Sequence, residues 1–205
     1  TDRFGEDNNA YRFDGIDDHI EIPDSDAFDI STFTLSAWVH ASSIPSSNSA
    51  DNILAHGEDP TSDNRNFALT IRENKFSAES EYPDDSNQFA LSGTSPAVDT
   101  WYHIVGRRDT NGDLQIYVNG TLENTISANE AIDPNIEQSL FIGAQYSKET
   151  NALNGFFTGT LDDIRIYDTA LSDPLIQQLY TEGGFILPVS PVLADARNDT
   201  NGVDL

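Results

Sequence analysis

Two Asn-Gly pairs, Asn111-Gly112 and Asn119-Gly120, constrain the fold of this chain more than any other feature of its sequence. Asparagine and glycine supply the positive φ angles that tight hairpin turns require, so each pair predicts a reversal between antiparallel strands. Segments with strand patterns flank both turns, at 101–105, 114–118 and 121–126. Residues 101–126 are therefore predicted to form a three-strand meander.

Further strand patterns occur on both sides of this meander. They alternate apolar and polar residues or flank a short turn, at 33–39, 66–71, 75–78, 140–143 and 159–167. One short helix is predicted after Ser172, which can cap it, with Pro174 in its first turn and Gly183-Gly184 beyond its end. The pattern predicts an all-β fold, a two-sheet antiparallel β-sandwich (jelly roll) with one short C-terminal helix.

The length of 205 residues suits one large domain with short tails. Residues 1–9 are interpreted as a lead-in and residues 10–188 as the sandwich. Residues 189–205 are polar and turn-rich, and they are interpreted as a linker or tail. We therefore expect a monomeric domain within a larger chain.

The charge balance excludes several classes of partner. Thirty-five acidic and ten basic residues give a formal net charge of −25, which repels nucleic-acid phosphates and acidic lipid headgroups. No apolar run approaches the roughly 18 residues that cross a bilayer, so no membrane insertion is expected. The 37% of hydrophobic residues suffices for a core and favours a folded chain over a disordered one. The absence of cysteine excludes a disulfide scaffold and a thiolate zinc site.

Six segments resemble, in order, the landmarks of laminin G-like, concanavalin A-type jelly-roll domains. They are residues 11–24, 33–39, 100–105, 114–120, 159–167 and 171–176. The resemblance covers roughly residues 10–183. It implies a two-sheet sandwich that binds glycans or proteins outside cells and commonly carries one calcium ion. Bacterial members of this family often lie in surface adhesins or beside the catalytic domains of polysaccharide-degrading enzymes.

The candidate calcium ligands are five aspartates. Asp14, Asp17 and Asp18 fall within five residues, at a turn between two predicted strands. Asp162 and Asp163 begin a strand that, in a fold like this family's, lies close to the N-terminal segment. Converging carboxylates repel one another, and Ca²⁺, which prefers oxygen ligands, removes that repulsion. We therefore predict a Ca²⁺ ion that pins the first and last strands together; the alternative is a set of solvated turn aspartates.

Sugar recognition needs an aromatic face and convergent polar groups, which loops on a rigid sandwich can supply. Polar loops at 56–66, 79–88 and 145–157 provide the candidates. The predicted glycan ligands are Asp63, Asn64, Arg65, Glu81, Tyr82, Asp84, Tyr146 and Asn154. The alternative for each is a solvated surface residue or, for Arg65, a salt bridge. Trp38 and Trp101 lie within strong strand patterns and are interpreted as core residues.

The sequence lacks the paired Glu-x-Asp-x-x-Glu carboxylates of sandwich glycosidases and the Gly-x-Ser-x-Gly and His-Glu-x-x-His motifs, so no enzymatic activity is expected. The favoured function is a calcium-dependent carbohydrate-binding (lectin) module of a secreted or cell-surface bacterial adhesin. Its partners would be glycans or polysaccharides, including host or algal cell-surface glycans. The alternatives are a protein-binding or spacer domain of a large extracellular protein, or an accessory module of a polysaccharide-degrading enzyme.

Overall fold

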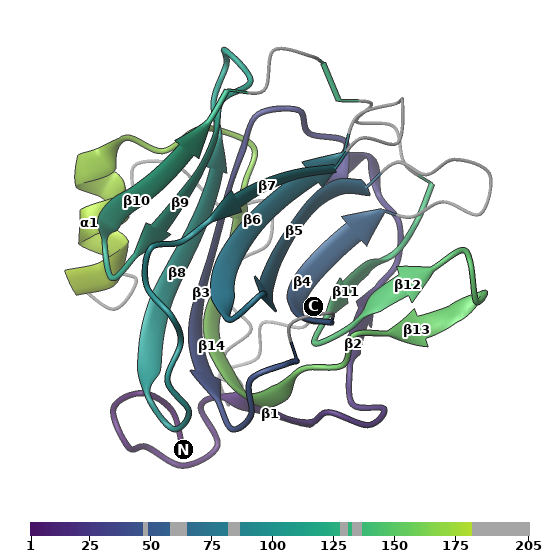
Figure 1. The fold of residues 1–205 in the computed structure, drawn as a ribbon, viewed down its shortest axis with the longest axis vertical. Coiled ribbons are helices and arrows are strands. Elements are labelled where there is room, and N and C mark those ends of the chain that lie inside the picture. Colours follow the sequence, from purple (N-terminus) through teal and green to yellow (C-terminus); the bar gives the residue numbers. More distant parts are fainter. Residues whose placement is uncertain (47–48, 58–64, 82–86, 128–130, 133–136, 182–205) are drawn as a thin grey trace.

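The computed structural model describes the chain except for residues 47–48, 58–64, 82–86, 128–130, 133–136 and 182–205. Two six-stranded antiparallel sheets pack face to face, with a two-stranded hairpin and one short helix beside them (Figure 1). The predicted all-β sandwich with one short C-terminal helix is confirmed. The described residues contain no helix long and apolar enough to cross a membrane.

The first sheet carries most of the residues of the candidate site described below. Its order is β1 (Tyr11–Asp14), β14 (Thr158–Tyr167), β3 (Phe33–Ala41), β8 (Trp101–Arg108), β9 (Leu114–Val118) and β10 (Thr121–Ile126). The strands β8, β9 and β10 are the predicted meander, and Asn119 and Gly120 have φ angles of 50° and 76° in its second turn. The predicted reversal at each Asn-Gly pair is therefore confirmed, although in the first turn only Gly112, with a φ of 90°, has a positive angle.

The second sheet closes the other side of the core. Its order is β2 (Ile20–Ile22), β11 (Leu140–Ile142), β4 (Ala50–Gly57), β5 (Arg65–Arg72), β6 (Lys75–Glu81) and β7 (Asn87–Leu91). The hairpin that projects beside it consists of β12 (Gln145–Ser147) and β13 (Ala152–Asn154). A short 3₁₀ helix, η1 (Asp26–Phe28), lies between β2 and β3.

Strand β3 shows how the sequence sets the two faces of the first sheet. Leu35, Ala37 and Val39 are fully buried in the core between the sheets. Side chains alternate along a strand, so Trp38 and His40 project from the outer face. Trp38 and Trp101 are only half-buried and lie outside this core, so their interpretation as core residues is wrong.

The helix α1 (Asp173–Thr181) covers part of that outer face (Figure 1). It begins directly after Ser172, as predicted, and the backbone carbonyl of Ser172 accepts hydrogen bonds from its first turn. Ile176 and Leu179 form a second apolar cluster with Val105 of β8 and Tyr117 of β9. The rest of the outer face, toward β1, is not covered by this cluster.

Candidate functional site

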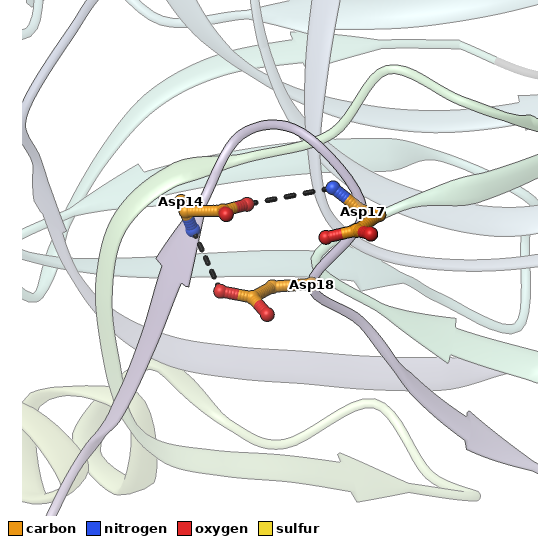
Figure 2. Close-up of side chains that lie close together, drawn as sticks. All are labelled: Asp14, Asp17 and Asp18. Carbon is orange, nitrogen blue, oxygen red and sulfur yellow. Dashed lines mark hydrogen bonds between the residues drawn. The ribbon is translucent and has the colours of Figure 1, made fainter.

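Asp14, Asp17 and Asp18 form an exposed triad in the loop between β1 and β2, with ligand oxygens within 4.8 Å of one another. Figure 2 shows the hydrogen bonds that hold the loop: the Asp17 N–H donates to Asp14 at 3.4 Å, and the Asp14 N–H donates to Asp18 at 3.0 Å. The backbone N–H of Ile16, at 2.8 Å, holds the pKa of Asp14 below its ordinary value. The triad is thus a set of close carboxylate oxygens, the donor type that Ca²⁺ prefers.

Asp162 and Asp163 do not join this triad. The register of β1 against β14 places Thr158 opposite Asp14, so four residues of strand, about 13 Å, separate Asp14 from Asp162. Both side chains are 2% exposed and form ion pairs with Arg3. The structure thus places only three of the five predicted aspartates together, and these two are partners of arginine.

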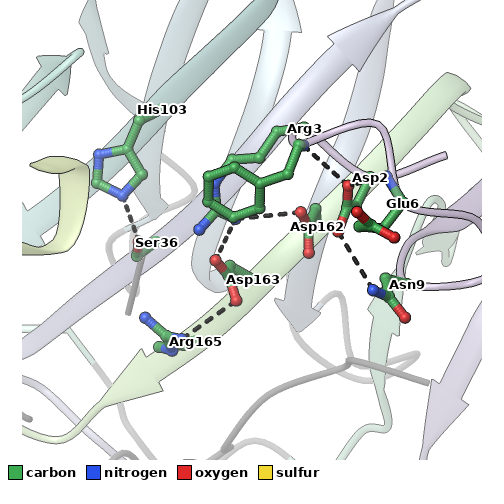
Figure 3. A network of polar contacts seen from close by, with 10 residues as sticks. Asp2, Arg3, Glu6, Asn9, Ser36, His103, Asp162, Asp163 and Arg165 are labelled. Atoms are coloured by element: carbon green, nitrogen blue, oxygen red, sulfur yellow. Dashed lines mark hydrogen bonds and ion pairs between the residues drawn. The ribbon is translucent and has the colours of Figure 1, made fainter. Parts of the chain in front are cut away.

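The partners of Asp162 and Asp163 form a buried polar network (Figure 3). Arg3 donates to Asp162 at 3.1 Å, and Arg165 donates to Asp163 at 3.2 Å. The ladder between β14 and β3 shifts register between Asp162 and Arg165, and Asp163 has a φ of 49°, which marks a β-bulge. Two arginines face two aspartates, so the network is balanced in charge and is best explained as structural.

The N-terminal segment enters this network through Arg3. Its guanidinium is 4.8 Å from the ring of Trp38, and its side chain is 4% exposed. The carboxylate of Asp2 accepts the backbone N–H of Glu6 at 2.8 Å and so closes the turn that presents Arg3. The segment expected as a lead-in, residues 1–9, is therefore anchored to the first sheet through Arg3.

His103 lies beside the same network and is almost fully buried. Its Nε2 lies 2.9 Å from the hydroxyl of Ser36. Burial, together with the nearby positive charges of Arg3 and Arg165, lowers the pKa of His103 to about 3. The imidazole is thus neutral at physiological pH, which suits a packed residue.

The eight predicted glycan ligands are placed unevenly. Five involve parts of the chain outside the described residues: Asp63, Asn64, Tyr82 and Asp84, together with the side chain of Arg65. Glu81 is buried at the end of β6. Tyr146 and Asn154 lie on the β12–β13 hairpin, where the Tyr146 hydroxyl donates to Asn151 at 2.6 Å.

A hollow that the sequence did not reveal lies on the outer face of the first sheet. The strand register places Arg12 opposite Thr160, Thr160 opposite His40, and His40 opposite Trp101. These residues form one row across β1, β14, β3 and β8. The hollow above them has a volume of about 270 Å³, and it is also lined by Thr1 and Ser42.

The lining of this hollow, which we call the row hollow, combines an aromatic surface with polar groups. The rings of His40 and Trp101 are in contact, with centroids 5.2 Å apart and planes inclined by 51°. The remaining lining residues carry hydroxyl groups and the guanidinium of Arg12. Indole rings bury apolar surface, while hydroxyl, imidazole and guanidinium groups orient a polar ligand, and small-molecule sites combine these two features.

The Asp triad lies next to the row hollow. Asp14 follows Arg12 by two residues on β1, so both side chains leave the same face, about 7 Å apart along the strand. Ser42 of the hollow donates its backbone N–H to Thr158, the residue opposite Asp14, at 2.9 Å. The triad and the row hollow therefore form one continuous region at the β1 edge of the sheet.

A second hollow, of about 280 Å³, lies at the opposite end of the sandwich strands around Arg108 and the turn after β8. Arg108 is buried and donates to the carbonyl of Ser31 at 2.5 Å. The described lining of this second hollow includes Asp109 but no aromatic residue. It therefore lacks the stacking surface that distinguishes the row hollow.

Comparisons with solved structures agree with this architecture. A pentraxin from Limulus polyphemus superposes with a TM-score of 0.62 at 14% identity, covering 87% of this chain and 84% of the pentraxin. Domain 4 of an extracellular arabinanase from Geobacillus stearothermophilus, solved with arabinotriose, gives 0.64 at 18% identity, covering 84% and 76%. The binding domain of a paraclostridial mosquitocidal protein gives 0.67 at 14% identity. The match covers 85% of this chain but only 43% of the mosquitocidal protein's chain.

Sequence comparison identifies the family. No curated protein sequence matches the chain significantly. Identities of 14–18% to the solved structures establish the fold alone. The family profile described as the concanavalin A-like lectin/glucanases superfamily, laminin G type, matches residues 14–177, which is most of the chain. The chain therefore belongs to the concanavalin A-like lectin/glucanases superfamily.

Proposed function

We propose that this chain is a non-catalytic carbohydrate-binding module that holds a glycan in the row hollow. The observation that carries the proposal is the contact between His40 and Trp101 on an open outer face, beside hydroxyl and guanidinium groups. A sugar ring presents an apolar face of C–H groups and an edge of hydroxyl groups. The ring of Trp101 stacks against the first, and the polar side chains of the row bind the second.

The Asp triad adds a calcium site beside the glycan. Carboxylate oxygens of Asp14, Asp17 and Asp18 lie close enough together to bind one ion, with backbone carbonyls and water completing its ligands. A bound Ca²⁺ supplies positive charge that offsets three exposed carboxylates. The loop between β1 and β2 then holds a fixed shape at the edge of the row hollow. The calcium dependence of the module follows from this neighbouring position.

Binding without catalysis is supported by the residues that line the row hollow. Glycoside hydrolysis uses a pair of carboxyl groups on either side of the scissile bond. The described lining contains no aspartate and no glutamate. The Asp triad lies to one side of the row on a single loop, rather than across the hollow from a second carboxylate.

An extracellular or cell-surface setting completes the proposal. A net charge of −25 suits surroundings where cations screen and bind carboxylates. One structural neighbour is itself a domain of an extracellular arabinanase. We propose attachment to glycans, as part of an adhesin or as an accessory module beside a catalytic domain.

A glycan array in millimolar calcium, repeated in chelator, tests this function. Binding to a defined family of sugars, lost in the Trp101→Ala variant, is the expected result. No binding in either buffer would overturn the proposal and favour a protein-binding or spacer role. Binding that persists in Trp101→Ala would indicate that the glycan binds at the hairpin β12–β13 or at another part of the chain.

A further inference from the structure

Arg12 differs from the other arginines whose ion pairs the structure describes. Arg3, Arg72, Arg107 and Arg165 each lie within 4.0 Å of a carboxylate. Arg12 is exposed, and within the described residues it has no such partner. A cation left unpaired in a chain with 35 acidic residues is available to an anion from outside the protein.

The surroundings of Arg12 also favour an external anion. None of the described residues that line the row hollow carries a carboxylate, so a ligand there competes with no described internal partner for the guanidinium. The nearest acidic side chains, those of the Asp triad, already share their charge with backbone N–H groups of their own loop: Asp14 with that of Ile16, and Asp18 with that of Asp14. The second hollow offers the contrast, because its Arg108 is buried on a backbone carbonyl with Asp109 nearby.

The charged group and the aromatic ring lie at opposite ends of the row. Arg12 and Trp101 stand three strand spacings apart, a distance of about 14 Å between their backbones. This is longer than one sugar ring, so the row suits a short oligosaccharide lying across the strands. A ring stacked on Trp101 then places a neighbouring sugar within reach of the guanidinium.

We propose that the row hollow selects acidic glycans, whose carboxylate or sulfate group binds Arg12 while a neighbouring sugar stacks on Trp101. The inference rests on the proposed carbohydrate-binding function and names the class of glycan. The planar guanidinium offers paired N–H donors that match the two oxygens of a carboxylate or sulfate. Hydrogen bonds to charged groups are stronger than those between neutral groups, so the acidic group of the glycan determines the binding preference.

The test is an array that presents neutral, uronate and sulfated forms of the same sugar backbones. The pair with the strongest contrast is then titrated by calorimetry with the wild type, Arg12→Gln, Arg12→Lys and Lys75→Gln. Lys75 is the first residue of β6 on the other sheet, and its substitution changes the net charge by the same amount. Comparison of the uronate and sulfated glycans on the array identifies which acidic group the protein binds.

The expected result is a preference for acidic over neutral forms that Arg12→Gln reduces by about tenfold or more, with neutral binding unchanged. Arg12→Lys should retain part of the preference, and Lys75→Gln all of it. Equal binding of neutral and acidic forms, or a preference that survives Arg12→Gln, would overturn the inference and leave the carbohydrate-binding function standing. An array with no bound glycan would overturn both.

Discussion

The guanidinium of Arg3 lies 3.1 Å from the carboxylate of Asp162, and this buried ion pair joins residues 159 positions apart. It ties the first residues of the chain to β14, the last strand of the sandwich. The same guanidinium packs against the ring of Trp38. An arginine thus holds the N-terminal segment against the last strand.

Replacement of Arg3 should strongly destabilise the fold. Arg3→Gln leaves Asp162 and Asp163 buried without their partner, and breaking a buried pair in this way costs about 3–5 kcal/mol. Urea unfolding at pH 7 measures the loss. Arg12→Gln, an exposed arginine with no ion pair in the described part of the chain, is the control and should change stability far less. Equal losses in the two variants would contradict a specific role for the buried pair.

His103 should make stability depend on pH. Its folded pKa of about 3 lies below the ordinary 6.5, so the unfolded chain binds more protons between these values. Stability from this group is therefore complete above pH 6.5 and is lost as the pH falls toward 3. Between pH 7 and pH 5 the loss is about 2 kcal/mol.

The comparison of wild type with His103→Asn isolates that loss. Asp51, whose pKa is raised to about 6 by burial, acts in the opposite direction, but it is the same in both proteins. The variant will be less stable at pH 7, yet its free energy of unfolding should change less between pH 7 and pH 5. Parallel pH profiles for the two proteins would show that His103 does not titrate as its burial requires.

Calcium should stabilise the wild type through the Asp triad. Calcium at about 100 times its Kd is expected to raise the Tm by roughly 5–10 °C. Asp17→Asn should remove most of this shift, because the Asp17 carboxylate belongs to the triad and accepts no hydrogen bond described in the structure. Asp7→Asn, which changes the charge equally outside the triad, should keep it. A Tm that is the same in calcium and in chelator would contradict the site.

Features coded by neighbouring residues could be predicted from the sequence. The meander follows from Asn-Gly turns, and the helix from Ser172, Pro174 and an apolar stripe. The Asp triad was found because its three members lie within five residues of one turn. Each of these signals acts over a single turn of chain, where local geometry decides the outcome.

Features that depend on register could not be predicted in the same way. The row hollow joins residues 12, 40, 101 and 160, which meet only once four strands have been aligned. The alternation along β3 did carry a partial signal: with Val39 inside, His40 must face outward. The aspartates of β14 were misassigned because a bulge and a distant arginine determine their environment.

The most direct test of the account is the affinity of Trp101→Ala for the glycan that the wild type binds best, measured by calorimetry in calcium. Phe89→Ala is the matched control, since Phe89 is a half-buried aromatic on the second sheet that packs against Arg72 at 3.9 Å. We predict that Trp101→Ala loses about tenfold or more in affinity while Phe89→Ala binds as the wild type does. Unchanged affinity in a folded Trp101→Ala protein would contradict glycan binding in the row hollow.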